Sequence, residues 1–322
     1  MKVCIVGAGA IGGWMAGLLA EGGNDVSLYA RGETLAALNA HGLRVRRGGK
    51  DAVYRLNASQ DAAALGTQDA VIIATKGQSV PAVAPAVNAL CGEDTIVVPA
   101  VNGIPWWFFQ MKGVPLSGTA LARVDPGGDC ARSIPFERVI GCVVHASSWM
   151  PEPGLVQVNG EDKLIFGEPD GSSSDRCKAF AAAFKTGAPQ IVVGDNIRRD
   201  IWLKLWGNMT MNPLSVLTGA TTLQMLSEPD VCALVREMML EMQRIGEKIG
   251  LPIPLTPEDR MAITRKLGDI KTSMLRDWEA HRALEIDPIL GVLAEIAQRV
   301  NEPAPFLHAV LGLLRLRAGI KN

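Results

Sequence analysis

The chain has 322 residues, of which 48% are hydrophobic and 20% are charged, as in an ordinary folded protein with about two domains. The formal net charge of −1 gives no general attraction to nucleic acid or to an anionic membrane, so neither partner is expected. No apolar run reaches the length of about 18 residues that a membrane span needs. Six scattered cysteines without a CxxC pair favour buried free thiols in a cytoplasmic protein over a zinc site or a disulfide framework.

The chain opens with KVCIVGAGAIGGWMAGLLAEGGNDVSLYAR, a stretch that has two interpretations. A lysine followed by apolar and small residues resembles a secretory signal peptide. The same letters fit a buried strand at 3–6, a helix at 11–21 and a second strand at 25–29. Further apolar strands at 69–74 and 95–98 alternate with helical stretches, which is typical of a parallel sheet covered on both faces. A signal peptide needs no such repetition, so the strand and helix interpretation is preferred.

The sequence changes character after about residue 138. Two strands, at 139–145 and 154–158, are separated by turn residues and are expected as antiparallel additions to the parallel sheet. Three long helices are expected after them, at about 201–217, 228–250 and 288–301. We therefore expect an α/β protein with a Rossmann-type doubly wound sheet at 1–195 and a mainly α-helical domain at 196–322.

A glycine-rich turn joins the first strand to the first helix. The residues that match the GxGxxG pattern are Gly7, Ala8, Gly9, Ala10, Ile11 and Gly12. Gly7 would permit the tight turn, Gly9 would let a pyrophosphate approach the backbone, and Gly12 would let the helix pack closely on the strand. The helix N–H groups and its positive dipole end would then bind the phosphates. The pattern predicts dinucleotide binding, and a glycine-rich packing turn is the alternative.

Three further residues follow predicted strands at the edge where sheets of this kind bind ligands. Arg31 occupies the place at which NAD-binding proteins usually carry an acidic residue, and its guanidinium can bind a 2′-phosphate. NADPH is therefore expected over NADH, although the nearby Glu33 weakens the argument. Lys76 and Asn102 are candidates for cofactor or substrate contacts. An ordinary surface or loop position is the alternative for each of the three.

A polar stripe runs along the predicted helix at 201–217. Lys204, Asn208 and Asn212 are spaced by four residues, so they share one side of that helix. Their neighbours are mostly tryptophan, leucine and methionine, and buried polar groups need partners. A catalytic or substrate-binding stripe is one interpretation, and the solvent-facing side of an amphipathic helix is the other. Pro213 is expected to bend the helix just beyond Asn212.

The stretch TSMLRDWEAHRALEIDPILG leads into the last of the three predicted helices. Asp287 is expected to cap that helix, with Pro288 at its first position. Glu285 would then lie just outside a helix N-terminus, where a carboxylate is favourable, and Ser273 would open the preceding short helix. Considered alone, these residues are most simply structural caps.

Together these features resemble the ketopantoate reductase (2-dehydropantoate 2-reductase) family over nearly the whole chain. The resemblance is carried by the glycine turn with Arg31, Thr75-Lys76, Asn102-Gly103, Lys204 with Asn208 and Asn212-Pro213, and SMLRDWEAHRALEID. It implies an enzyme that reduces 2-dehydropantoate to (R)-pantoate with NADPH, in the route to pantothenate and coenzyme A.

The resemblance also implies roles for individual residues. Lys204 would protonate the developing alkoxide as a general acid, and Glu285 would orient Lys204 or bind the terminal hydroxyl of the substrate. The substrate-binding residues would be Asn102, Asn208, Asn212 and Ser273. Asn102 would also contact the cofactor. No metal is implied, the expected partner is a small 2-oxo acid, and the chain could form a homodimer.

The run Trp106, Trp107, Phe108 and Phe109 lies in a stretch that is longer than compact family members need. A core or dimer contact is one explanation, and a lid or pocket wall shaped for a different 2-oxo acid is the other. Gln78 also stands where an apolar or aromatic residue is expected. Two alternative functions therefore stay open: a paralogous NADPH-dependent reductase of another 2-oxo acid, and a non-catalytic dinucleotide-sensing protein.

Overall fold

A computed structural model describes residues 1–184 and 189–320, which form two compact units. Unit 1 comprises Met1–Val101 and Gly127–Asp200, and unit 2 comprises Asn102–Pro126 and the chain from Ile201 onward. The sequence predicted a single boundary at residue 195 and kept 102–126 in the first domain. That segment instead joins unit 2, because the aromatic run near its start packs against a helix of unit 2.

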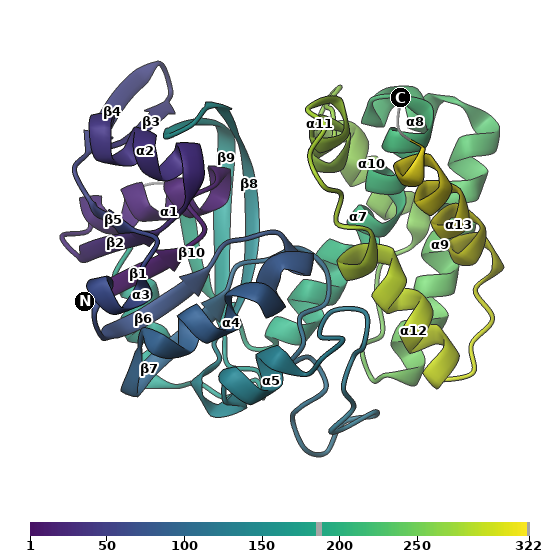
Figure 1. The fold of residues 1–322 in the computed structure, drawn as a ribbon. Coiled ribbons are helices and arrows are strands. Elements are labelled where there is room, and N and C mark those ends of the chain that lie inside the picture. Colours follow the sequence, from purple (N-terminus) through teal and green to yellow (C-terminus); the bar gives the residue numbers. More distant parts are fainter. Residues whose placement is uncertain (185–188, 321–322) are drawn as a thin grey trace. The chain divides into compact units, whose positions relative to one another are not determined.

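Unit 1 is built on a five-stranded parallel sheet with the strand order β5-β2-β1-β6-β7 (Figure 1). Its strands are β1 (Lys2–Val6), β2 (Asp25–Tyr29), β5 (Asn57–Ser59), β6 (Gln68–Ile73) and β7 (Cys91–Pro99). The apolar side chains of 3–6 and 70–73 on the central strands β1 and β6 are fully buried, as expected when helices cover both faces. The predicted parallel, helix-covered sheet is thereby confirmed.

The helices of the first sheet follow its strands in alternation. They are α1 (Ala10–Glu21), α2 (Gly32–His41), α3 (Ala62–Leu65) and α4 (Val80–Ala89), with a short 3-10 turn, η1 (Gly77–Ser79), before α4. Later short helices of unit 1 are α5 (Asp129–Ser133), η2 (Phe136–Arg138) and α6 (Asp175–Ala182). The alternation of strands and helices predicted for the first hundred residues is therefore found in the first sheet, where a helix follows each strand from β1 to β6.

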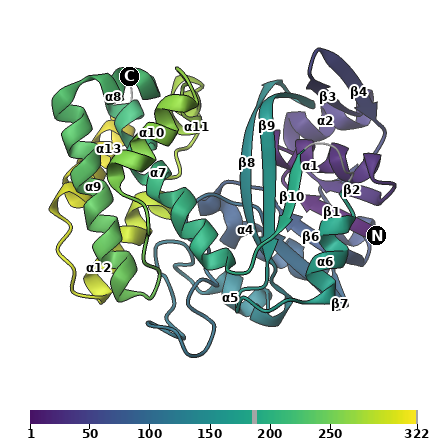
Figure 2. The same ribbon diagram turned by 180° about the vertical axis from the view of Figure 1, so that it is seen from behind.

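A second five-stranded sheet completes unit 1 (Figure 2). It contains β3 (Leu43–Arg47), β4 (Lys50–Tyr54), β8 (Gly141–Glu152), β9 (Leu155–Gly167) and β10 (Gln190–Val193). The prediction that β8 and β9 extend the parallel sheet is wrong. They are antiparallel to each other, but β9 pairs in parallel with β3 and β10. An isolated bridge joins Val97 of the first sheet to Val139, two residues before β8. An apolar strand pattern does not reveal which neighbour supplies its hydrogen bonds.

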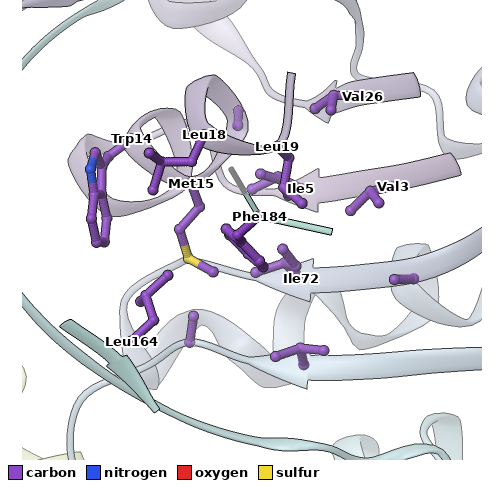
Figure 3. Close-up of a cluster of buried hydrophobic side chains, with 14 of the residues drawn as sticks. Val3, Ile5, Trp14, Met15, Leu18, Leu19, Val26, Ile72, Leu164 and Phe184 are labelled. Atoms are coloured by element: carbon purple, nitrogen blue, oxygen red, sulfur yellow. The ribbon is translucent and has the colours of Figure 1, made fainter. Parts of the chain in front are cut away.

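The core of unit 1 lies around α1, which is buried along most of its length. Met15 and Leu19 of α1 cluster with Ile5 and Ile72 of the first sheet and with Leu164 of the second (Figure 3). Small residues allow this packing: an added Cβ at Gly13 would lie 2.7 Å from the side chain of Val156 on β9. The helix that follows the glycine turn is therefore held on both sides, which fixes where the turn lies.

Unit 2 is helical, as predicted. Its helices are the part of α7 (Ile197–Thr218) from Ile201 onward, α8 (Thr222–Ser227), α9 (Pro229–Lys248), α10 (Pro257–Lys266), α11 (Ser273–Glu279), the π-helix η3 (Asp287–Gly291), α12 (Val292–Arg299) and α13 (Pro305–Gly319). The predicted helix at 288–301 is divided into η3 and α12. Pro213 lies inside α7, which continues for five more residues.

The aromatic run at 106–109 belongs to the core of unit 2. All four side chains are at most 4% exposed, and the ring of Phe108 stacks on that of Trp202 in α7, with centroids 6.4 Å apart. The Glu295 carboxylate of α12 accepts hydrogen bonds from the backbone N–H groups of Ala122 and Arg123, both at 3.0 Å. These bonds hold the C-terminal end of the segment 102–126 against α12. Of the two explanations for the aromatic run, a core or dimer contact and a lid or pocket wall, this packing within unit 2 supports a core role.

Two expectations from composition concern cysteines and membranes. All six cysteines are free thiols, and Cys4, Cys130, Cys142 and Cys177 are buried, as expected. Burial raises the pKa of the Cys4 thiol to about 11. Within the described residues, no helix combines the length and the apolar character needed to cross a membrane.

Candidate active site

The glycine turn between β1 and α1 requires glycine at its first and last positions. Gly7 has φ +105°, and a Cβ there would lie 2.8 Å from the methyl group of Thr75 and 2.9 Å from the carbonyl oxygen of Ala74. A Cβ at Gly12 would lie 2.0 Å from the carbonyl oxygen of Gly7. The tight turn predicted for Gly7 matches its geometry. The close packing predicted for Gly12 against the strand is found against the Gly7 carbonyl, directly after the end of β1.

Gly9 differs, because nothing in the protein would contact a Cβ at this position within 4 Å. Its backbone is in the extended region, and it occupies the N-cap position of α1 without a side-chain hydrogen bond to the helix. The first N–H groups of α1, on Ala10, Ile11 and Gly12, therefore have no side-chain cap. An open backbone before an uncapped helix N-terminus fits a pyrophosphate.

The remaining predicted cofactor residues follow strands that flank β1. Arg31 is exposed and stands at the N-cap of α2, two residues after β2, with Glu33 in the first turn of that helix. Lys76 is half-buried and precedes η1, three residues after β6, and Gln78 is exposed. Because β2 and β6 both pair in parallel with β1, these residues and the glycine turn lie at the same edge of the sheet.

Three polar side chains of unit 2 form the centre of the candidate site. The Lys204 ammonium donates to Asn102 Oδ1 at 2.8 Å, and Asn102 Nδ2 donates to Glu285 Oε2 at 3.1 Å. An ammonium group only donates and a carboxylate only accepts, so the Asn102 amide satisfies both in one orientation alone. The oxygen therefore faces Lys204 and the nitrogen faces Glu285.

The chain places Asn102 beside Glu285 through backbone contacts of its neighbours. Gly103 has φ +84°, and a Cβ there would lie 1.9 Å from the carbonyl oxygen of Pro288. The N–H of Ile104 donates to that same oxygen at 3.1 Å. These contacts hold the start of the segment against the residues that follow Glu285, which is itself only 5% exposed.

Helix α7 presents Lys204 from a well-anchored position. Trp202 stacks on Phe108, and the indole N–H of Trp206 donates to the Met239 carbonyl at 3.0 Å. Both tryptophans are at most 1% exposed. The tryptophans that the sequence places around Lys204 therefore hold its helix, while Lys204 itself stays half-buried.

We call the side chains of Lys204, Asn102 and Glu285 the Lys204 group. Among the described residues, no hydrogen bond joins this group to the other predicted substrate residues, Asn208, Asn212 and Ser273. Asn208 is half-buried one turn after Lys204, and Asn212 is 5% exposed two turns after it. Ser273 is exposed and is the first residue of α11, as predicted. The cap of α11 is its neighbour Thr272, whose hydroxyl accepts from the Leu275 N–H at 3.1 Å. Two adjacent hydroxyl residues give a sequence pattern that does not separate cap from first turn.

The predicted cap at Asp287 is wrong. The residue before η3 is Ile286, which is already helical and makes no side-chain cap. The Asp287 carboxylate instead accepts from Arg315 of α13 at 2.6 Å. The chain is helical from Ile286 onward, so Glu285 does lie just outside a helix N-terminus, as predicted, and its carboxylate also accepts from Asn102 Nδ2.

Comparison with known proteins identifies the family. The model for the ketopantoate reductase PanE/ApbA family matches residues 3–171, and the model for its C-terminal part matches residues 196–318. A 2-dehydropantoate 2-reductase of Mesorhizobium japonicum is 41% identical over 98% of this chain and 97% of its own.

Solved structures agree with this assignment. A crystal structure from Ralstonia solanacearum MolK2, described as a candidate ketopantoate reductase, has a TM-score of 0.95 and 45% identity and covers 98% of this chain and 97% of its own. D-mandelate dehydrogenase, solved with NADH and anilino(oxo)acetate, shares the fold alone, with a TM-score of 0.84, 20% identity and coverage of 99% and 98%. The chain thus belongs to the ketopantoate reductase family, whose members are nicotinamide-dinucleotide-dependent oxidoreductases.

Proposed function

We propose that the protein reduces 2-dehydropantoate to (R)-pantoate with NADPH. The observation that carries the proposal is the contact of Lys204 with Asn102 and of Asn102 with Glu285. It puts a proton-donating ammonium group at a fixed place in a partly buried site, which suits general-acid catalysis of ketone reduction. The 41% identical 2-dehydropantoate 2-reductase supports the choice of substrate.

The chemistry assigned to the protein's own side chains is proton donation. NADPH, when bound, would supply the hydride for the ketone carbon. Lys204 would donate a proton to the ketone oxygen as negative charge develops on that oxygen. An ammonium group carries three N–H donors, and the one given to Asn102 fixes the side chain's direction. The charge of Lys204 also stabilises the forming alkoxide, which is commonly the largest contribution to catalysis.

Glu285 acts on Lys204 through Asn102 in this proposal. Its carboxylate holds the amide nitrogen, so the amide oxygen stays turned toward the ammonium. Asn208, Asn212 and Ser273 are proposed as contacts of the substrate's carboxylate and hydroxyl groups. Asn102 is proposed to contact cofactor and substrate besides Lys204.

The cofactor residues are proposed from the turn geometry. The uncapped N-terminus of α1 and the open backbone at Gly9 would hold the pyrophosphate of NADPH. Arg31 would bind the 2′-phosphate, and Lys76 would reach a phosphate or the substrate. The homodimer and the cytoplasmic location stay predictions, as does the absence of nucleic acid among the partners.

Steady-state kinetics with a panel of 2-oxo acids, each with NADPH and with NADH, tests the proposal. We expect the highest kcat/KM for 2-dehydropantoate with NADPH. Equal or higher values for pyruvate or phenylpyruvate would favour the paralogous reductase instead. The burial of Trp106–Phe109 in unit 2 supports a core role for the aromatic run, so we rank the paralogous reductase second. An absence of turnover with every acid, despite NADPH binding, would favour the dinucleotide sensor.

A further inference from the structure

Arg260 of α10 lies directly against the helix that carries Lys204. An ideal Cβ built at Gly207 of α7 would lie 2.1 Å from Arg260 Nη2 and 2.8 Å from its Cζ. The guanidinium therefore occupies the space that any other side chain at 207 would fill. Glycine inside a helix costs about 1 kcal/mol relative to alanine, and this close approach is a physical reason to have it there.

A hydroxyl group fixes one edge of this guanidinium. Arg260 Nη1 donates to Thr264 Oγ1 at 2.9 Å, and Thr264 Oγ1 donates in turn to the Arg260 carbonyl at 3.1 Å. Thr264 is 4% exposed. The Thr264 hydroxyl thus both accepts a hydrogen bond and donates one, which holds the Arg260 guanidinium in one orientation. The edge of the guanidinium formed by Nε and Nη2 faces away from Thr264.

That other edge has no carboxylate partner among the residues that the structure describes. Arg176 of unit 1 shows how the same edge is used elsewhere in the protein: its Nε and Nη2 donate to the two oxygens of Glu168 at 2.7 and 2.6 Å. The pKa of Arg176 is raised by that carboxylate, whereas burial lowers the pKa of Arg260. A partly buried cation without a counter-ion is costly, and an anionic ligand would remove the cost.

The position of Gly207 connects this guanidinium to the candidate site. Gly207 is three residues after Lys204 and directly before Asn208, and residues three apart are neighbours on the surface of a helix. A 2-oxo acid carries its carboxylate on the carbon next to the ketone. A group that binds the carboxylate must therefore lie near the group that protonates the ketone oxygen.

We propose that Arg260 binds the carboxylate of the 2-oxo acid through Nε and Nη2, a site that rests on the proposed function. Two parallel N–H groups match the two oxygens of a carboxylate, and such bidentate pairs add both energy and orientation. Gly207 is the position that makes room for this guanidinium, and Thr264 is the residue that orients it.

Arg260→Met tests the site because methionine keeps much of the volume and removes the charge. We expect KM for the 2-oxo acid to rise about 10- to 100-fold, with little change in the Kd for NADPH. The Tm without ligand should stay equal or rise, because an unpaired cation has been removed. A KM within threefold of the wild-type value, or a lower Tm with unchanged KM, would overturn the proposal and leave Arg260 as a packing residue.

Two further variants guard against a failure of Arg260→Met to fold. Arg260→Lys keeps the charge but not the paired donors, so it should give an intermediate KM, and a wild-type KM would contradict the proposal. Arg265→Met, on the same helix, is the control: Arg265 is exposed and donates to the Leu226 carbonyl, so its loss should leave KM unchanged. An equal rise in KM for Arg265→Met would show a general charge effect and overturn the specific site.

A binding measurement separates this inference from the proposed function. Oxamate, a 2-oxo acid analogue, should raise the Tm of the wild-type protein but not that of Arg260→Met. If no 2-oxo acid is reduced and the shift still depends on Arg260, the carboxylate site stands and the reductase assignment fails. If 2-dehydropantoate is reduced and oxamate shifts both proteins equally, the assignment stands and the role of Arg260 is refuted.

Discussion

The glycine turn of unit 1 and the Lys204 group of unit 2 are built in opposite ways. The turn is backbone: Gly7, Gly9 and Gly12 lie within six residues and act through the side chains they lack. The Lys204 group is made of the side chains of Asn102, Lys204 and Glu285. In sequence, Lys204 is 102 residues from Asn102 and Glu285 is 183 residues from it. A site of the first kind is encoded locally, whereas a site of the second kind depends on the fold of a whole unit.

The largest effect is expected where the Lys204 group loses its proton donor. Lys204→Ala should lower kcat about 10³-fold, within the range for loss of a positioned general acid, while the Kd for NADPH changes little. Steady-state kinetics and a fluorescence titration of NADPH measure the two quantities. Lys178→Ala, at an exposed position on α6, is the matched control and should behave as wild type. Normal turnover by Lys204→Ala would remove Lys204 from the mechanism.

Two alanine variants of the glycine turn separate ligand binding from packing. In Gly9→Ala the new methyl group contacts nothing in the protein, so the Tm without ligand should be unchanged, while the Kd for NADPH rises about 10- to 100-fold by steric exclusion of the pyrophosphate. In Gly12→Ala the methyl group would lie 2.0 Å from the Gly7 carbonyl oxygen, so the Tm should fall even without ligand.

Thermal melts with and without NADPH give both results in one experiment. The informative outcome is the contrast between the two positions, since both variants add one methyl group to the same turn. If Gly9→Ala binds NADPH as tightly as wild type, the turn does not hold the pyrophosphate.

The sequence predicted the features that depend on neighbours in the chain. The strands at β1 and β2, helix α1 and the turn between them follow from apolar runs and glycine spacing, which report local geometry. The pairing of β9 with β3 instead of the first sheet was not predicted, because hydrogen-bond partners far apart leave no periodic signal. The transfer of 102–126 to unit 2 was missed for a related reason: aromatic letters show that Phe108 is buried but not against which helix.

The candidate site divides along the same line. Lys204, Asn102 and Glu285 were each named from sequence, with help from a family resemblance, but the amide bridge between them was not. The close approach of Gly103 to Pro288 helps to place Asn102 beside Glu285. In the sequence, the only indication of this approach was the dipeptide Asn102-Gly103. The sequence did not indicate a role for Arg260, because that role depends on its contact with Gly207 in another helix.

Arg31 offers a smaller effect that sharpens the description of the turn's edge. Arg31→Ala should raise KM for NADPH roughly tenfold and leave KM for NADH unchanged, because only NADPH carries a 2′-phosphate for the guanidinium. The control is Arg55→Ala, another exposed arginine of unit 1, which donates to the Ala40 carbonyl. Equal changes for both cofactors would mean that Arg31 does not recognise the 2′-phosphate.

The N-terminus of α13 is a useful contrast with the uncapped start of α1. Its own N-cap, Ala304, has no side-chain hydrogen bond, but the buried Glu241 of α9 accepts from the N–H groups of Phe306 and Leu307, both at 2.8 Å. The N–H groups at the start of α13 are satisfied by a carboxylate of the protein, whereas the start of α1 has no side-chain cap. An anion is thus expected to stabilise the start of α1 but to find no place at α13.

The smallest effect is expected from Glu241→Gln, which replaces one acceptor oxygen by an amide nitrogen. The free energy of unfolding should fall by about 1 kcal/mol at acid pH, since one helix N–H loses its acceptor. Burial raises the pKa of Glu241 above 4.5, so the folded protein keeps this proton at a pH where the unfolded chain has lost it. Wild-type stability from this group therefore declines as pH rises from 4.5 through the folded pKa. Glutamine does not titrate, so the difference in the free energy of unfolding between wild type and Glu241→Gln should shrink over that pH interval, as measured by urea unfolding at several pH values. A difference that grows with pH would mean that the two N–H bonds to the charged carboxylate outweigh the cost of burying that charge.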